Sequence, residues 1–455
     1  MRSRPAALVG FLLIFGACGA SSGRWESSAG TREASVLHVR LNADATSRWG
    51  RAEHATTYSD LQAAIDAADD GDTVRIAPGL FHAHPQPFRE PLCGNCLEHR
   101  TVVRASTGFR IMGKRITLLG AGADQTVLST GAGYGVYLED ADGSVIRHLA
   151  VTGGRRDADG NATDAAVVVR GGCVTLESLH LRDNTDRAEG VVVGIGGVMG
   201  REGADLVIRN CRIVNNGWDG VALYRGATAL IADNVIETGR GAGIGITWDA
   251  AAMALRNRIS GYWKGIGTFG VSRAVVRNNA VFDNLGWGII ATGDSHLDAA
   301  HNVIARNGNC GLAVWSETAT GIAIHNIIVE NGWRKEWVCP RVGIWHQSRQ
   351  EIFPVGTNLL FGNAAGDWLS ELGEEPLGEL LQADPRFRGA VDFRLESGSP
   401  AVDAGDASRT DSDGTLPDVG LTGGPSARPE TGGPPGPLPA ERERVGSAAW
   451  IQSRR

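Results

Sequence analysis

The chain has 455 residues, 63 of them glycine, and a formal net charge of −7. The acidic balance argues against a nucleic-acid partner, because binding of phosphates needs a basic face. A chain of this length can bury a large core, and its many glycines are typical of frequent tight turns. The composition therefore fits one extended domain, which we expect to be a monomer.

The first 18 residues have the features of an export signal. Arg2 and Arg4 precede an apolar run at 6–15, which has only about half the roughly 20 residues of a membrane-spanning helix. The run ends in Gly16-Ala17-Cys18, which resembles a bacterial lipobox with phenylalanine where leucine is commoner. We therefore expect a signal peptide at 1–18 and lipidation of Cys18, with plain secretion as the alternative. Either way the protein is exported, as a cell-envelope lipoprotein or a secreted protein.

Residues 19–55 are interpreted as a tether and lead-in, and residues 57–71 carry a helical pattern. Ser59 and Gln62 form a capping box, and Gly71 ends the helix. The apolar stripe of this helix suits it to cap the open end of a β-solenoid, which exposes apolar groups. Strands are predicted at 72–78, 115–119 and 126–129, with an insertion at 81–109. Larger excursions follow at 153–165 and 183–205.

A sequence pattern with a period of 22 to 24 residues then recurs along the chain. Each copy has an asparagine followed two residues later by an aliphatic side chain, and the asparagines are Asn234, Asn257, Asn279, Asn302 and Asn326. A second row has an aliphatic residue after glycine in every copy: Val221, Ile244, Ile266, Ile289 and Leu312. A unit this short cannot close its own core, so its apolar side must be covered by the copies above and below.

The repeat is a β-solenoid rather than a helical one. Each copy is broken by glycine after about five residues and is rich in valine and isoleucine, which excludes two helices per repeat. In a parallel β-helix, equivalent residues lie roughly 4.8 Å apart. Asparagine suits the turns because it tolerates the left-handed region and its amide can bond to the amide of the next coil. The asparagine ladder is predicted to begin at Asn234.

These sequence repeats resemble those of the pectate-lyase-like superfold over roughly residues 55–420. The resemblance implies an all-β fold, a single-stranded right-handed parallel β-helix with an N-terminal capping helix, and we place the β-helix at 56–366. The superfold includes lyases, hydrolases, epimerases, binding modules and structural proteins, so the resemblance does not define an activity. The chain lacks the Arg-x-Pro-x-x-Arg of pectate lyases, the Gly-His-Gly and Arg-Ile-Lys of polygalacturonases, and the Asp-Pro-His of mannuronan epimerases. Those activities are not expected.

Strand alternation predicts a trough on the outside of the strands that follow each glycine. One outward row is mostly small (Ala222, Gly245, Gly267, Ile290, Ala313), and the next carries aromatics (Tyr224, Thr247, Phe269, Thr292, Trp315). The adjoining turns add Trp218, Asp219, Trp263, Lys264 and Trp287 on one side, and Arg225, Trp248, Asp249, Asp294, His296 and Glu317 on the other. Aromatic faces stack on sugars, and charged groups orient hydroxyls or carboxylates.

The trough therefore predicts a polysaccharide as partner. The substrate-binding set is Asp219, Tyr224, Arg225, Trp248, Trp263, Phe269, Trp287, Trp315 and Glu317. In an enzyme, Asp249 and Asp294, two coils or roughly 10 Å apart, would be acid and base of an inverting hydrolysis. A lyase would use Lys264 to abstract a proton, with Arg225 or a cation neutralising a uronate. The alternatives are a noncatalytic glycan-binding lipoprotein and a structural or adhesive solenoid, because aromatics and charges on solenoid turns also serve packing and solubility.

The cysteines and the C-terminal part add three expectations. Without Cys18, six cysteines remain, an even number consistent with disulfides in an exported chain. Cys310 and Cys339, in corresponding turns of neighbouring coils, are the predicted bridge, whereas Cys173 and Cys211 are expected to be buried thiols. Cys93 and Cys96 are expected either to form a local disulfide bridge or to bind a metal ion.

Residues 367–420 are predicted to form a C-terminal module, and 421–455 a disordered tail rich in Pro, Gly and Arg. Asp411, Asp413 and Asp418 supply oxygen ligands for calcium, with a solvated acidic turn as the alternative. No other cofactor is expected.

Overall fold

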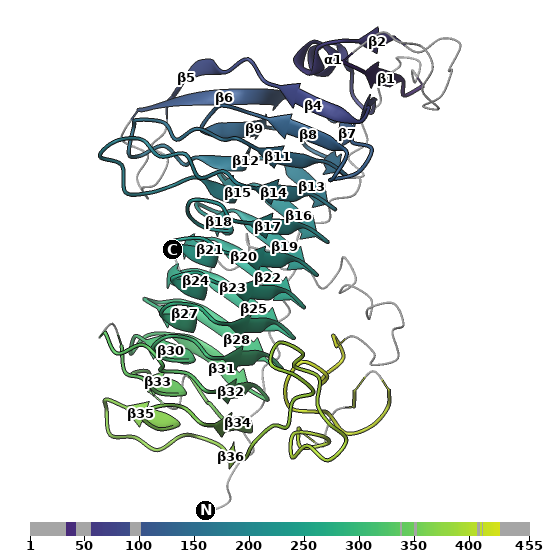
Figure 1. The fold of residues 1–455 in the computed structure, drawn as a ribbon. Helices are drawn as coiled ribbons and strands as arrows, with labels where there is room; N and C mark the ends of the chain where they lie inside the picture. The colour runs from purple at the N-terminus through teal and green to yellow at the C-terminus, as the bar shows by residue number, and fades with distance from the viewer. Residues whose placement is uncertain are drawn as a thin grey trace, which may run out of the picture.

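The computed structural model describes residues 33–41, 56–91, 102–336, 339–349, 353–406, 410–411 and 413–427. Within these ranges the chain winds into a tall stack of coils (Figure 1), and each regular coil contributes one strand to each of three sheets. The strands that lie above one another pair in parallel, apart from an antiparallel hairpin at the N-terminal end. The parallel β-helix predicted from the repeats is therefore confirmed. No helix in the described residues is long and apolar enough to cross a bilayer.

Each sheet has 12 strands. The first sheet consists of β2 (Thr57–Tyr58), β1 (Val36–Val39), β3 (Thr73–Ile76), β7 (Thr117–Leu119), β10 (Ser144–Arg147), β13 (Cys173–Glu177), β16 (Asp205–Arg209), β19 (Thr228–Ala232), β22 (Ala251–Leu255), β25 (Arg273–Arg277), β28 (His296–Ala300) and β31 (Thr320–Ile324). The second consists of β4 (Gly79–His82), β8 (Thr126–Ser129), β11 (Ala150–Thr152), β14 (His180–Arg182), β17 (Arg212–Val214), β20 (Val235–Glu237), β23 (Arg258–Ser260), β26 (Ala280–Phe282), β29 (Val303–Ala305), β32 (Ile327–Val329), β34 (Asn358–Phe361) and β36 (Leu380–Gln382).

The third sheet carries the candidate site. It consists of β5 (Gln86–Glu90), β6 (Val103–Met112), β9 (Tyr134–Glu139), β12 (Ala165–Arg170), β15 (Gly196–Arg201), β18 (Val221–Leu223), β21 (Ala242–Trp248), β24 (Lys264–Gly270), β27 (Trp287–Thr292), β30 (Leu312–Trp315), β33 (Ile344–His346) and β35 (Trp368–Ser370). Its predicted inward row pairs in register from Val221 through Ile244, Ile266 and Ile289 to Leu312, and all five side chains are fully buried.

The predicted asparagine ladder is present. Each side-chain amide from Asn234 to Asn326 donates to the Oδ1 of the next asparagine, at 2.9–3.0 Å, and the ladder ends on Asn358. One part of the reasoning is wrong: the left-handed residue is the one before each asparagine, such as Asp233 or Arg256. The asparagine itself is buried, and its amide satisfies backbone groups of the turn.

A second ladder lies between the second and third sheets and escaped the sequence reasoning. The side chain of Asn284 donates to Asn307, Asn307 to Asn331, and Asn331 to Asn363, each at 2.9–3.0 Å. Tyr262 occupies the preceding coil, where its backbone N–H donates to Asn284. Two of the three corners of the stack are thus stabilised by stacked amides.

The capping helix is present but shorter than predicted. Helix α1 spans Leu61–Ala67, and its N-cap is Asp60, whose carboxylate accepts from the N–H of Ala63. The proposed capping box of Ser59 and Gln62 is therefore wrong, because the Gln62 amide exchanges two hydrogen bonds with the backbone of Arg110 instead. The helix buries an apolar face in the core at the N-terminal end of the stack.

The domain boundaries also differ from those predicted. Residues 36–39 form strand β1 of the first sheet rather than part of a tether, and the coils continue past 366 to β36. The described residues between 384 and 427 then fold back along the outside of the second sheet, beside its C-terminal strands (Figure 1). Phe393, Leu395 and Val419 pack there against strands β26 to β34.

Candidate functional site

The outer face of the third sheet has glycine at the same register position on two successive strands. Gly245 on β21 pairs in register with Gly267 on β24, and the row continues to Ala222 on one side and Ile290 on the other. This is the small row predicted from the repeat. We call the face above Gly245 and Gly267 the strip.

These two glycines are not required by the fold. A Cβ added at Gly243 or Gly265, which face the core in the same strands, would lie 2.3 Å from a methyl carbon of the next coil. At Gly245 the nearest atom to an added Cβ is 3.5 Å away, an ordinary contact, and at Gly267 it is the flexible Lys264 chain at 3.1 Å. Neither glycine has a positive φ. Glycine in a strand interior often marks a site that a ligand or another backbone approaches closely. Both glycines are buried in this structure, and the Lys264 side chain lies over one of them.

A buried carboxyl borders the strip. Asp219 precedes β18 and is 8% exposed, and its Oδ1 accepts a hydrogen bond of 2.5 Å from the N–H of Ala242. An added Cβ at Gly245 would lie 3.8 Å from the other carboxyl oxygen, so this oxygen faces the strip. Burial raises the pKa of Asp219 to about 6, although the Lys264 charge acts in the opposite direction. Such a group can give or take a proton near neutral pH.

Lys264 lies on the same edge of the sheet. It pairs in register with Ala242, and the carbons of its side chain lie across Gly267, within 3.1–3.3 Å of where a Cβ would be. The structure thus brings together two residues of the predicted site, Asp219 and Lys264, over the glycine floor.

Aromatic rings flank the strip. Trp248 and Phe269 make an edge-to-face contact at 5.1 Å, and Phe269 is 46% exposed. Toward the C-terminal end Trp315, which is 43% exposed, stacks on the buried Trp287 at 6.1 Å and contacts Trp345 at 5.2 Å. The exposed rings of Phe269 and Trp315, which lie in the same outward row, offer flat apolar faces to a ligand.

Three other predicted binding residues serve packing. Tyr224 belongs to a covered apolar cluster, and Arg225 is buried beside it in an ion pair with Glu202. Trp287 is buried within a second cluster, which the half-buried Trp263 contacts. The low exposure of these three residues depends on side chains from other coils and from the insertions that cover them.

The predicted catalytic carboxylates lie away from the strip. Asp249 follows β21 and accepts a hydrogen bond of 2.8 Å from the N–H of Gly226 in the coil below, so it holds a turn. Asp294 is exposed in the equivalent turn after β27, and Glu317 is exposed in the turn after β30. All three border the first sheet rather than the glycine floor.

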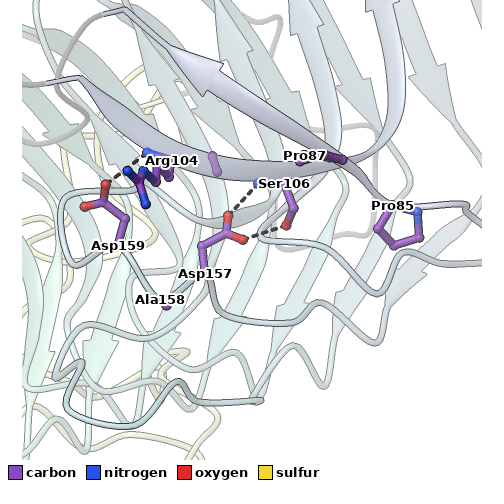
Figure 2. A pocket seen from close by; sticks show the side chains of 8 residues that line it. Pro85, Pro87, Arg104, Ser106, Asp157, Ala158 and Asp159 are labelled. Atoms are coloured by element: carbon purple, nitrogen blue, oxygen red, sulfur yellow. Dashed lines mark hydrogen bonds between the residues drawn. The ribbon is translucent and has the colours of Figure 1, made fainter.

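A hollow of about 690 Å³ lies between the β5–β6 hairpin and the excursion that follows β11. Figure 2 shows Asp157 and Asp159 pointing from the excursion toward Ser106 and Arg104 of β6. Asp157 accepts hydrogen bonds from the backbone and hydroxyl of Ser106, and Asp159 accepts one from the N–H of Arg104. These carboxylates tie the excursion to the hairpin.

The sulfur atoms of Cys310 and Cys339 lie 2.9 Å apart, and both residues are thiols in this structure, so their oxidation to a bridge stays a prediction. Cys211 is a buried thiol as expected, whereas Cys173 is disulfide-bonded, so the expectation of a thiol there is wrong. Cys18, Cys93 and Cys96 lie outside the described residues.

The acidic turn gives no support to a calcium site. Asp411 accepts hydrogen bonds from the backbone N–H groups of Asp418 and Gly424, and Asp413 accepts from Thr415. The described part of the chain contains no group of three or more His, Cys, Asp or Glu residues suited to a metal ion.

The similarity of this chain to known proteins is a similarity of fold. The sequence matches the family described as right handed beta helix region at residues 123–250 and 194–353, which together span half of the chain. Among solved structures, the mannuronan C-5 epimerase AlgE6 A-module of Azotobacter vinelandii has 17% identity and a TM-score of 0.42, covering 71% of this chain and 94% of that one. Pectate lyase Pel9A has 14% identity and a TM-score of 0.42, covering 86% and 97%. No curated protein matches the sequence. At these identities no activity is transferred to the chain.

Proposed function

The chain belongs to the right-handed β-helix family, and from that premise we propose that it binds an extracellular polysaccharide at the strip. The observation that carries the proposal is the pair of glycines at 245 and 267. The fold leaves room for side chains at both positions, yet the sequence leaves both empty, beside a buried carboxyl and exposed aromatic rings. Sugars offer apolar C–H faces to rings and hydroxyls to charged groups, which matches this lining.

Catalysis at the strip would use Asp219 as the proton-transfer group. Its carboxyl faces the strip, and burial raises its pKa into the range suited to an acid or base. Lys264, as an ammonium group, would neutralise a uronate carboxylate. Asp249 and Asp294 remain the alternative catalytic pair. Asparagine at either position would remove the charge while keeping a side-chain oxygen that can accept a hydrogen bond.

The test is binding of a polysaccharide panel by matched aromatic variants. Phe269→Ala removes an exposed ring beside the strip and should weaken binding by on the order of 1 to 2 kcal/mol. Phe361→Ala removes a ring that is 42% exposed on the second sheet, and should leave binding unchanged. Equal effects of the two substitutions would contradict the location of the site. Depolymerisation lost in Asp219→Asn with binding retained would identify an enzyme.

Export through a lipid anchor belongs to the same proposal. Cys18→Ser should release the protein from the membrane fraction, because lipidation of this residue is the membrane attachment that the sequence offers. Unchanged fractionation of the variant would contradict the lipoprotein assignment but not the glycan site.

The second candidate function is a structural solenoid, favoured by the covered aromatic clusters around Tyr224 and Trp287. It predicts that no glycan in the panel binds the wild type and that both phenylalanine variants behave alike.

A further inference from the structure

The excursion between β11 and β12 carries two carboxyl groups that lie side by side. We call this segment, residues 153–164, the strap. The side chain of Asp164 is fully buried, and its Oδ2 accepts hydrogen bonds from Arg156 at 2.5 Å and from the N–H of Asp157 at 2.6 Å. The carboxyl groups of Asp157 and Asp164 both face the backbone of Gly133 on the neighbouring coil and interact directly with each other.

The charges at this pair do not balance. The guanidinium of Arg156 is fully buried, and besides Asp164 it bonds to the carbonyl groups of Ala162 and Val193. A single cation therefore faces two carboxyl groups. Within the described residues the Oδ1 of Asp164 is buried without a hydrogen-bond partner, so ionisation would leave a charged oxygen that no donor contacts. Such an arrangement favours retention of one proton by the two carboxyl groups.

The pKa values of both groups agree with this geometry. Burial raises the pKa of Asp164 to about 7, with Arg156 acting against the rise and the charge of Asp157 adding to it. Burial also raises the pKa of Asp157. The two groups titrate as one unit, which carries a proton at mildly acidic pH and loses it near neutrality.

The Asp157 side chain is also the main link between the strap and the β5–β6 hairpin. Its two oxygens accept hydrogen bonds from the N–H and the hydroxyl of Ser106 on β6, at 2.8 and 2.7 Å. The same hydroxyl accepts a hydrogen bond of 2.9 Å from the N–H of Gly133. Figure 2 shows this link at the edge of the hollow, so displacement of Asp157 would open one side of it.

The other charged or titratable side chains around the strap have partners of their own. These are Glu90 with Arg201 and Tyr134, Arg155 with Asp186, and His84 with Asp60. Asp159 accepts hydrogen bonds from the backbone N–H groups of Arg104 and Asn161. Arg104 contributes its side chain to the lining of the hollow (Figure 2). The strap thus has one proton-dependent contact with the hairpin, at Asp157 and Asp164.

We infer that the strap is a pH-dependent closure, held over the β5–β6 hairpin while Asp157 and Asp164 share a proton and released from it as the pair ionises. Release would expose the donors of Ser106 and widen the hollow. The inference does not depend on glycan binding at the strip.

The direction of the pH dependence follows from linkage. A carboxyl group whose pKa is raised in the closed form binds its proton more tightly there than in the open form. The closed form is therefore most stable below about pH 4, loses stability as the pH rises through about 7, and changes little above that value. One proton leaves on opening, so the open fraction should rise by about tenfold per pH unit over most of this window.

Hydrogen exchange of the full protein, followed by mass spectrometry between about pH 5 and 8, measures the opening. Rates are converted to protection factors, which removes the intrinsic pH dependence of exchange. The reporters are the N–H of Ser106, which donates to Asp157, and the N–H of Asp157, which donates to Asp164. Their protection factors should fall by about tenfold per pH unit up to about pH 7 and then level off.

A matched pair of variants tests the assignment to the carboxyl pair. Asp164→Asn keeps an acceptor for Arg156 and offers an N–H to Asp157 in place of the shared proton, so it should abolish the fall in protection while keeping the strap closed. Asp159→Asn alters a neighbouring carboxylate of the same strap and should keep the slope. If Asp164→Asn does not fold, Asp157→Asn, which leaves one carboxyl group facing Arg156, should reduce the slope.

Three results would overturn the inference. The first is protection of the wild-type strap that does not change with pH between about 5 and 7, and the second is protection that rises over this range. The third is a slope in Asp164→Asn, or in Asp157→Asn where that variant replaces it, equal to the slope of the wild type. Each of these results would leave the proposed glycan site unaffected.

Discussion

Substitution of Gly245 separates stability from ligand binding. Gly245→Ala places a methyl group on the strip at ordinary contact distance, 3.5 Å from Ala242 and 3.8 Å from Asp219. Since the backbone there is compatible with any residue, loss of unfolded-state entropy should stabilise the protein by about 0.4–1 kcal/mol. The same methyl group occupies space that the ligand needs, so binding should weaken by about 1–3 kcal/mol, or 10- to 200-fold.

The control is Gly243→Ala, two residues earlier in the same strand. Its methyl group would point into the core, 2.3 Å from the Cγ2 of Ile259 and 2.7 Å from the carbonyl of Gly265. Overpacking of this kind costs roughly 1–3 kcal/mol or more. Thermal melts should therefore move in opposite directions for the two variants.

The assay is a melt of each variant followed by calorimetric titration with the polysaccharide that binds the wild type best. If Gly245→Ala lowers stability as much as Gly243→Ala, glycine is required by the fold at both positions and the argument for the strip fails. If Gly245→Ala is stable and binds as the wild type does, the ligand lies elsewhere.

Further substitutions test the Asp219 carboxyl, the asparagine ladder and the buried ion pair of Glu90 with Arg201. Burial raises the pKa of Asp219 to about 6, so the stability of the wild type should fall as the pH rises from about 4 through 6. Asp219→Asn should abolish this decline and should be up to about 3 kcal/mol more stable than the wild type at neutral pH. Thermal melts across that pH range measure both effects. Asn279→Leu should cost roughly 1–3 kcal/mol by leaving turn groups unpaired, and Asn358→Leu, at the ladder's end, should cost less in the same melts. Glu90→Gln should cost roughly 3 kcal/mol, because it removes the nearer of the two carboxylates paired with the buried Arg201 and leaves Glu202 at 3.5 Å. Glu90→Leu with Arg201→Met should recover most of this loss in denaturant unfolding.

The stacking of the coils could be predicted because it depends on residues a fixed number of positions apart. Asn234 and Asn257 stand 23 residues apart, and their amides meet at 3.0 Å. The second ladder has the same signal, since Asn284, Asn307 and Asn331 are separated by 23 and 24 residues. The second ladder was not predicted because Gly239 and Tyr262 occupy its position in two coils where the first ladder has asparagine.

The limits of the site could not be predicted, because they depend on contacts without a period. Glu90 and Arg201 are 111 residues apart, and nothing in the repeat indicates that their pairing buries Tyr224. The difference between Gly243 and Gly245 is likewise invisible in the sequence, since alternation would place two residues that are two positions apart on the same face. Only the packing of the next coil shows which of the two the fold requires.

A uniform solenoid has no natural end to a binding surface, because each coil repeats the one below. A site of finite length must therefore come from departures from the repeat. Here the hairpin with Glu90 closes one side, and the enlarged coil with Cys339 closes the other. The repeats supply a floor of constant spacing, and the insertions add side chains that pack over its two ends. Binding on this face should accordingly depend on the insertions as well as on the repeats, because only the insertions differ from coil to coil.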